Sequence, residues 1–339
     1  MPAVSRLRLL RWIVLTAVVA VLLAIGYSVF VSRVYKRPIP TVRAVIIDYR
    51  DAGLTAYDCG EATRYCFRWP LRLSSLEFLG YSHSRDAWAA VYADNAVSSK
   101  YTLSVIKPNR STVIYSGDRS LYSSALCGDV LYVPAYAQGC LLLKCYTLDG
   151  KPIGRIRLDI DNVAARFTIA VAPSGLIAAG LVRRGASEGS HIYLFGNNGK
   201  LRRRLASGDN PRFGGDGRYL AYKEITTAEK HSVRYTGRIT ILDLKTKRER
   251  SICTARPECS CLTGHASSNM RGYQLSPDGH ALICSYVQGW PVRTATQSIY
   301  VVDLSNDTPQ WYKLPIQVLP GWVVLDKVPR SFVRDCDKN

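Results

Sequence analysis

The residue types that could perform chemistry gather first near position 260, where three cysteines and a histidine lie close together: Cys253, Cys259, Cys261 and His265. Three thiolates and an imidazole are a donor set that zinc accepts. The spacing differs from that of a standard structural finger, because Cys259 and Cys261 would bring two ligands close together. In an oxidising compartment, disulfides across a long loop are the simpler interpretation, and free thiols are the third one.

The chain contains ten cysteines, which is more than a protein in a reducing compartment usually needs. Cys59 and Cys66 flank a short turn-like segment, so we expect them to form a local disulfide. Cys140 and Cys145 lie on one predicted strand with an odd separation, so their side chains should point to opposite faces and not pair. The complete set of disulfide candidates is Cys59, Cys66, Cys253, Cys259, Cys261 and Cys284.

Two further motifs suggest catalysis or metal binding but lack the surroundings that either needs. Residues 185–189 read Gly-Ala-Ser-Glu-Gly, whereas a nucleophile elbow of this pattern requires a helix after it. A predicted strand at residues 191–195 follows instead, so a hairpin loop is the better interpretation. Asp159 and Asp161 share one face of a strand, but no EF-hand pattern surrounds them. We therefore predict no catalytic residue, no metal site and no cofactor.

Residues 12–32 carry no charged side chain, and basic residues flank them on both sides. A helix of this length rises about 30 Å, which matches the hydrocarbon core of a bilayer. We therefore predict a transmembrane anchor, with a cleaved signal peptide and a buried core helix as alternatives. A small-residue cleavage site is present at residues 24–26, but the apolar run continues beyond it through Phe30, which favours retention.

Self-similar segments recur through the rest of the chain, which is the pattern of a repeat protein. The three best segments are residues 171–179, 211–222 and 273–283, and weaker copies lie at residues 84–91 and 127–133. Equivalent positions are spaced by 43, 45, 43 and 62 residues: Trp88, Leu131, Leu176, Tyr219 and Ala281.

The local physics of each repeat predicts a four-stranded antiparallel sheet. Pro277, Asp278 and Gly279 should form a tight turn, because proline fixes φ and glycine accepts a positive φ. Short apolar and β-branched runs on both sides predict strands, and no long helical periodicity appears after residue 40. Such sheets repeated about an axis form a β-propeller.

The string Pro-x-Phe-x-x-Asp-Gly-x-x-Leu-Ala-Tyr at residues 211–222 resembles the blade repeat of TolB-type, WD40-like propellers, as does Leu-Ser-Pro-Asp-Gly at residues 275–279. The resemblance covers about residues 80–315 and implies an all-β propeller of six four-stranded blades, with seven as the alternative. Strand-like runs at residues 43–73 and 318–336 are expected to close the ring by sharing one blade. The predicted organisation is a basic tail, a transmembrane helix, a juxtamembrane linker and a propeller domain: residues 1–11, 12–32, 33–42 and 43–336.

The chain is strongly basic, with 45 Lys and Arg against 26 Asp and Glu and a formal net charge of +19. A basic surface attracts anionic partners such as lipid headgroups or an anionic surface polymer, and the run at residues 202–204 adds local density. A solvated surface without a partner is the alternative. No aromatic-rich nucleic-acid motif lies between the basic residues, which argues against nucleic acid as the partner.

The long, variable loops are predicted to lie on one face of the propeller, opposite the Asp-Gly turns. They connect the second and third strands of three repeats, at residues 183–190, 223–237 and 286–297. Loops on one rim of a rigid scaffold are the usual place for binding, and arginine and aromatic side chains are favoured at interfaces. The predicted partner-binding residues are Arg183, Arg184, His231, Arg234, Tyr235, Trp290 and Arg293.

These patterns together predict a membrane-anchored β-propeller that acts as a non-catalytic binding or scaffolding module for a protein partner. The alternatives are an enzyme with a site in the central channel or the top-face loops, and a ligand sensor coupled to a separate signalling partner. The cysteine content favours a single-pass protein with its propeller on the extracytoplasmic side, although basic residues on both flanks of the anchor leave the orientation open.

Overall fold

The computed structural model describes residues 16–22, 42–50, 53–68, 74–93, 100–108, 110–137, 139–161, 163–183, 190–229, 232–253, 270–287, 297–306, 309–318 and 322–334. The chain divides into two compact units, Met1–Pro38 and Ile39–Asn339. In the first unit, residues 16–22 are helical and exposed. Across the described stretches, no helix combines the length and the apolar character that spanning a bilayer requires. The predicted anchor at residues 12–32 falls mostly outside these stretches.

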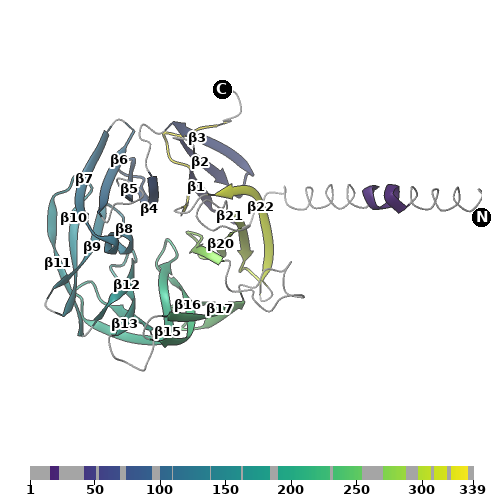
Figure 1. The fold of residues 1–339 in the computed structure, drawn as a ribbon. Helices are drawn as coiled ribbons and strands as arrows, with labels where there is room; N and C mark the ends of the chain where they lie inside the picture. The colour runs from purple at the N-terminus through teal and green to yellow at the C-terminus, as the bar shows by residue number, and fades with distance from the viewer. Residues whose placement is uncertain are drawn as a thin grey trace, which may run out of the picture. The chain divides into compact units, whose positions relative to one another are not determined.

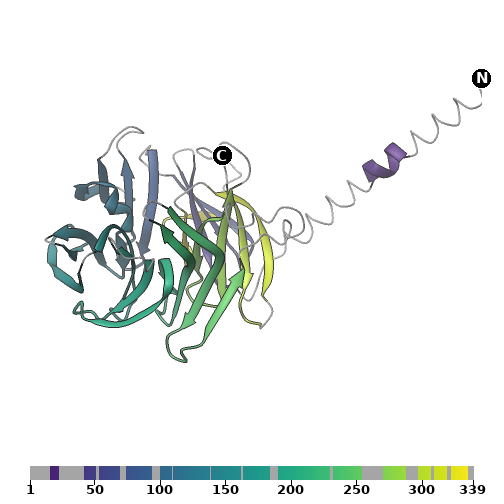
Figure 2. The same cartoon turned by 60° about the horizontal axis from the view of Figure 1, so that its bottom comes forward.

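The described residues of the second unit form β-strands in five hydrogen-bonded sheets and one short 3-10 helix, η1 (Arg119–Ser123). Figure 1 shows these sheets side by side around a ring, and Figure 2 shows the same ring tilted. Three of the sheets are four-stranded antiparallel meanders in chain order. Their strands are β4 (Ser74–Ser82), β5 (Ala87–Ala93), β6 (Tyr101–Lys107) and β7 (Arg110–Gly117); β8 (Ala125–Cys127), β9 (Val130–Ala137), β10 (Cys140–Thr147) and β11 (Pro152–Asp161); and β19 (Met270–Leu275), β20 (Ala281–Val287), β21 (Gln297–Asp303) and β22 (Gln310–Val318).

The fourth sheet is seven-stranded because one long strand belongs to two meanders. Residues 201–207 of β15 pair with β14, whereas residues 208–213 pair with β16. The predicted six blades, or seven, therefore differ from the five observed sheets, since β15 fuses two four-stranded meanders into one sheet. The strands of this sheet are β12 (Val163–Val171), β13 (Ile177–Arg183), β14 (Ser190–Phe195), β15 (Leu201–Phe213), β16 (Tyr219–Glu229), β17 (Ser232–Asp243) and β18 (Glu249–Cys253).

The fifth sheet combines strands from both ends of the second unit. Its order is β23 (Val323–Leu325), β1 (Val45–Arg50), β2 (Gly53–Asp58), β3 (Thr63–Arg68) and β24 (Val333–Arg334). Two strands from the C-terminal region thus flank three from the N-terminal region. This arrangement confirms the prediction that both ends of the repeat region share one sheet.

The tight turns between first and second strands form as the sequence predicts. Gly279 has a φ of 74° and donates its backbone N–H to the carbonyl oxygen of Ser276 at 2.9 Å. The carboxylate of Asp278 accepts hydrogen bonds from the Ser276 hydroxyl at 2.5 Å and the His280 N–H at 3.0 Å. An added Cβ at Gly279 would lie 2.1 Å from the ring of Tyr219. This position therefore needs glycine for its backbone conformation and for its close contact.

Apolar side chains fill the space between neighbouring sheets. Trp88 is 2% exposed, and its ring centroid lies 5.1 Å from that of Phe78 and 4.7 Å from that of Tyr81. It also lies 6.3 Å from the ring of Phe332, in the segment that leads to β24. Val45, Ile47 and Leu54 of the fifth sheet belong to the same cluster. The core is thus divided among the sheet interfaces, and each sheet is buried by both of its neighbours.

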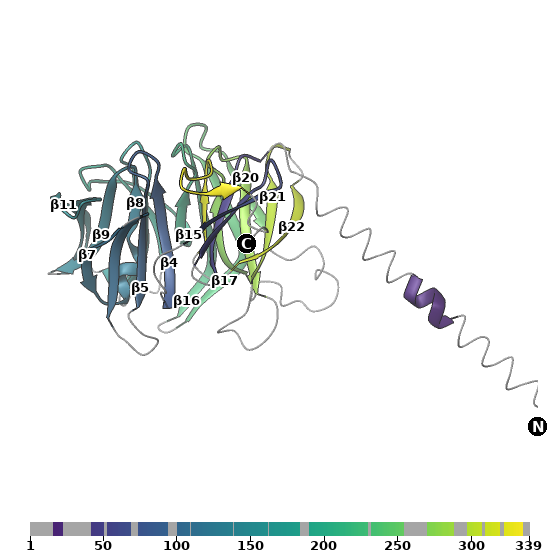
Figure 3. The same ribbon diagram turned by 90° about the horizontal axis from the view of Figure 1, so that it is seen from above.

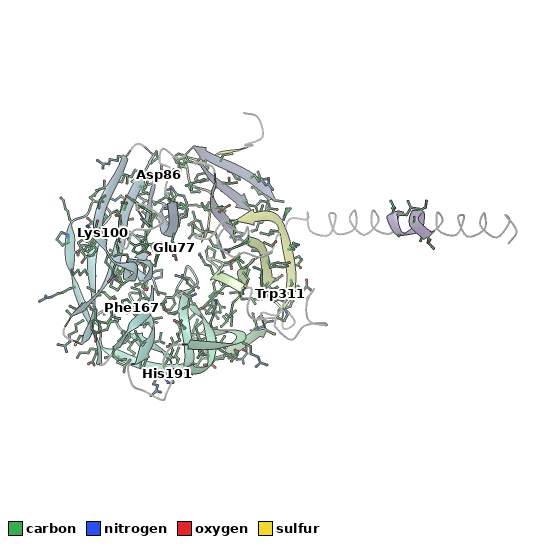
Figure 4. The ribbon with its side chains drawn as sticks, viewed as in Figure 1. Glu77, Asp86, Lys100, Phe167, His191 and Trp311 are labelled. Carbon is green, nitrogen blue, oxygen red and sulfur yellow. The ribbon has the colours of Figure 1, made fainter. Side chains whose placement is uncertain are left out.

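Side-chain hydrogen bonds reinforce these interfaces near the first strands of the sheets. The Gln274 side chain on β19 donates to the carbonyl oxygen of Trp322 at 3.0 Å and accepts from the N–H of Val324 at 3.1 Å. It therefore bonds to the backbone on both sides of Val323 in β23. At another interface, the Ser123 hydroxyl donates to the carbonyl oxygen of Phe167 at 2.7 Å (Phe167 is labelled in Figure 4).

Replacing Gln274 with leucine should lower the free energy of unfolding by about 2 kcal/mol, because a carbonyl and an N–H group lose their partners in the interface. The urea unfolding midpoint of the full chain measures this loss. Gln310→Leu is the matched control, since Gln310 is exposed and should change stability by less than about 0.5 kcal/mol. Equal losses of unfolding free energy in the two variants would contradict a stabilising role for the Gln274 hydrogen bonds.

Candidate functional site

The seven predicted partner-binding residues lie at or beyond the ends of described strands. Arg183 is the last residue of β13. Arg234 and Tyr235 lie in β17, where they pair with Thr227 and Ile225. The structure does not describe the side chains of these three residues. Four residues lie outside the described part of the chain: Arg184, His231, Trp290 and Arg293.

The strand ends that carry these residues are brought to one face, which we call the loop face. The last pairs before the three connections are Val182 with Ser190, Glu229 with Ser232, and Val287 with Gln297. Each connection joins a second strand to a third strand, so antiparallel order places all three on the side opposite the tight turns. Figure 3 shows the ring from the side, with β16 and β17 reaching its lower rim.

The carboxylate of Glu224 fixes the base of the hairpin that β16 and β17 form. Glu224 accepts hydrogen bonds from the hydroxyls of Thr240, Ser251 at 2.7 Å and Thr236 at 3.3 Å. Burial opposes ionisation of Glu224, but these hydroxyls outweigh it and hold the pKa of the carboxyl below its ordinary value. Three donors on β17 and β18 are therefore oriented toward one acceptor on β16, which makes the base of the hairpin a rigid support.

Polar groups also join three neighbouring first strands, β12, β15 and β19, in what we call the inner seam. Asp209 is 3% exposed and accepts hydrogen bonds from the Thr168 hydroxyl at 3.0 Å and the Asn210 N–H at 2.7 Å. The hydroxyl of Tyr273 donates to the carbonyl oxygen of Asn210. Gly180 packs against the seam, because an added Cβ there would lie 2.8 Å from the Thr168 oxygen. The Asp209 carboxylate is already occupied by hydrogen-bond donors, so we interpret the inner seam as a structural contact between strands.

The opposite face, which carries the tight turns, is cross-linked between sheets. Asp129, in the turn after β8, accepts hydrogen bonds from the hydroxyls of Ser82 at 2.5 Å and Ser84 at 2.7 Å in the neighbouring sheet. These hydroxyls lower the pKa of the Asp129 carboxyl. His83 lies 2.6 Å from the carboxylate of Asp326, which follows β23. The turn face is therefore held by contacts within the ring.

The structure corrects several of the expectations about disulfides. Four of the cysteines discussed above carry free thiols: Cys59, Cys145, Cys253 and Cys284. The predicted pair of Cys59 with Cys66 is wrong, because Cys59 is free and packs in an apolar cluster while Cys66 is disulfide-bonded. The partner of Cys66 lies outside the described residues. Cys253 and Cys284 are likewise not in disulfides, and the free thiol of Cys145 confirms that it does not pair with Cys140.

Burial keeps the interior thiols in their protonated form. It raises the pKa of Cys59 and of Cys284 to about 12, so both remain protonated at neutral pH. Two candidate disulfide and metal-ligand cysteines, Cys259 and Cys261, lie outside the described residues. Within the described stretches, no group of three His, Cys, Asp or Glu side chains is arranged to hold a metal ion.

The serine motif at residues 185–189 falls between two paired strands. β13 ends at Arg183 and β14 begins at Ser190, so a strand rather than a helix follows the motif. A nucleophile elbow requires a helix at this place, and its catalytic interpretation is therefore not supported. Asp159 is exposed on β11, and the side chain of Asp161 is not among those described.

Replacing Glu224 with glutamine should lower the free energy of unfolding by about 1 kcal/mol at neutral pH and flatten its decrease in acid. The pKa of Glu224 is lowered in the folded protein, so its contribution is complete above the unfolded pKa and is lost as pH falls through the folded one. Urea unfolding at a series of pH values measures both effects. Glu249→Gln, an exposed change on β18, is the control, and parallel curves for the wild type and Glu224→Gln would contradict the role of the carboxylate.

Comparisons with known proteins place the fold but not the function. No family profile matches the sequence, and no curated protein matches it. Among solved structures, TolB from Acinetobacter baumannii is 12% identical with a TM-score of 0.55, and the match covers 84% of this chain and 66% of that one. A chain of a nidogen/laminin complex is also 12% identical, with a TM-score of 0.52, and the match covers 84% of this chain and 100% of that one. These likenesses show that the second unit has an all-β, propeller-like fold.

Proposed function

We propose that this protein is a non-catalytic binding or scaffolding module that holds a protein partner on its loop face. The observation that carries the proposal is the convergence of three second-to-third-strand connections on that face. The strand ends that lead into them belong to consecutive meanders of the ring, so these ends stand next to one another on that face. Binding residues on a rigid scaffold lose little conformational entropy when a partner binds, which favours affinity.

Two features of the described structure support a binding role for this face. The β16 and β17 strands are 11 and 12 residues long, and their pairing continues to Glu229 and Ser232. The hydroxyls around Glu224 fix the base of this hairpin, so its end is held at a defined place. In contrast, the turn face is occupied by contacts within the ring. This difference favours the loop face as the side that binds a partner.

The structural likeness to a chain of a nidogen/laminin complex supports a protein as the partner. The matched chain was solved in a complex of two proteins, nidogen and laminin, and the likeness covers its whole length. The shared feature is the scaffold, so the identity of the partner depends on the loop side chains of this chain. The arginine and aromatic residues predicted there are of the types that dominate binding energy at protein interfaces.

We also infer that residues 12–32 anchor the protein in a membrane, with the propeller on the extracytoplasmic side. The described part of this segment supports the anchor, because Val18, Val19, Val21 and Leu22 are 48% to 62% exposed. Large apolar side chains that are exposed on a helix need an apolar environment such as lipid. The observation that supports this orientation is the disulfide of Cys66, because disulfides persist in oxidising compartments.

Replacing residues 226–234 with Asn-Gly should abolish partner recovery without lowering the unfolding midpoint. The change joins Ile225 to Tyr235, which already pair, through a two-residue turn that suits a hairpin. It removes the end of the hairpin and keeps the hydrogen bonds of Glu224. Proximity labelling of the full chain in its native membrane measures recovery. Lys245→Ser with Lys247→Gly, on the turn face, is the control and should keep the partner; equal recovery by both variants would refute the proposal.

Replacing Val19 and Leu22 with aspartate should release the full chain from membranes during an alkaline carbonate wash. Each charge at the centre of a bilayer costs about 2.5 to 3.5 kcal/mol on insertion scales. Val113→Asp is the control, because Val113 is 58% exposed on β7 and outside the anchor. Protease added to intact cells should then digest the propeller of the wild type. Protection of the propeller would reverse the orientation, and retention of the double variant would argue against the anchor.

A further inference from the structure

We propose that a basic surface on the outer strands of two neighbouring sheets docks onto anionic phospholipid headgroups. This surface, the basic rim, comprises residues 151–160 of β11 and its preceding turn and residues 196–205 at the start of β15. Figure 1 shows β11 at the outer edge of the ring. The proposal concerns a surface distinct from the loop face, and it depends neither on a protein partner nor on the N-terminal segment.

The basic rim concentrates positive charge. Its basic side chains are all exposed: Lys151, Arg155, Arg157, Lys200, Arg202, Arg203 and Arg204. Asp159 is the one acidic residue in these two segments. The ion pairs observed in the described part of the second unit involve none of Lys151, Arg155, Arg157, Lys200, Arg202 and Arg203. Seven basic side chains against one acidic side chain give the rim a formal net charge of +6.

The two segments form one surface because the turn before β15 packs directly on β11. The backbone N–H of Asp159 donates to the carbonyl oxygen of Gly199 at 2.9 Å. An added Cβ at Gly199 would lie 1.9 Å from the carbonyl oxygen of Arg157, so the two backbones touch. At the far end of the rim, Arg204 lies 2.6 Å from the ring of His191, which Figure 4 labels. The backbone of both segments is thus held in place by strand pairing.

Exposed apolar side chains lie among the arginines. Ile153 is 56% exposed and Leu201 is 42% exposed, and both are among the few large apolar side chains exposed in the described part of the second unit. Apolar side chains that reach into the headgroup region, next to Lys and Arg, are typical of proteins that lie on membrane interfaces. The rim contains no Phe, Tyr or Trp, whereas surfaces for single-stranded nucleic acid use aromatic side chains for stacking. Lipid headgroups therefore fit the rim better than nucleic acid does.

The charge is sufficient for useful membrane affinity. Each Lys or Arg near an anionic bilayer contributes about 1 kcal/mol, and a factor of ten in affinity corresponds to about 1.4 kcal/mol. Neutralising three arginines should therefore weaken binding at least tenfold. The effect should disappear at high salt, since exposed charges are screened beyond about 10 Å at 0.1 M ionic strength.

The test uses the full chain in phosphatidylcholine nanodiscs and measures capture of added vesicles. The vesicles contain phosphatidylcholine with or without phosphatidylglycerol. We expect capture only with phosphatidylglycerol, and at least tenfold weaker capture for Arg155→Gln, Arg157→Gln and Arg203→Gln combined. The matched control is Lys245→Gln, Lys247→Gln and Arg248→Gln, which removes the same charge from an exposed turn and should bind as the wild type does.

A second variant separates lipid from other polyanions. Ile153→Ser with Leu201→Ser should weaken vesicle capture severalfold and leave the net charge unchanged. Equal unfolding midpoints for all variants show that each is folded. The proposal is overturned if capture does not depend on phosphatidylglycerol, or if the arginine variant and its control bind alike. It is also overturned if duplex DNA competes for the rim and the serine variant captures vesicles as well as the wild type, because binding would then depend on phosphate charge alone.

Discussion

Pairing between the two ends of the second unit is the constraint on which the rest of the structure depends. Ile46 of β1 pairs with Val324 of β23, and Cys66 of β3 pairs with Val333 of β24. The C-terminal region therefore supplies both edges of the sheet formed by the first three strands. An isolated sheet of this kind would expose its edges and both apolar faces to water. Each sheet gains its two buried faces only when its neighbours stand beside it, so the stability of every sheet depends on ring closure.

Ring closure also decides where sequence can vary. All seven residues of β21 are buried, and six of seven are buried in β5. The outermost strands β7 and β18 are largely exposed or half-buried. Packing therefore favours apolar and small residues at most positions of these two strands, whereas the outermost strands and the hairpin ends are free to carry charge. The loop face and the basic rim both lie in the unrestricted parts.

The repeat, its turns and its strands could be predicted because each depends on local chemistry. Trp88 and Tyr219, which the repeat spacing aligns, lie in the second strands β5 and β16. The fusion of two meanders could not be predicted. Residues 207–211 read Ser-Gly-Asp-Asn-Pro, a composition that indicates a turn. Instead, Asn210 takes a φ of 55° and the register shifts after Asp209, so β15 continues through a bulge.

The sequence pattern could not predict the hydrogen-bonded carboxylates, because their partners are distant along the chain. Asp209 bonds to Thr168 across 41 positions, and Glu224 bonds to Ser251 across 27. Both acceptors use hydroxyl groups where a chain so rich in arginine could have supplied guanidinium groups. The hydroxyls of Thr168 and Ser251 come from other strands, so each carboxylate joins strands that are far apart in sequence. Such pairs leave no local motif in the sequence, because a hydroxyl-bearing residue is common in strands and only the folded chain selects the one that reaches the carboxylate.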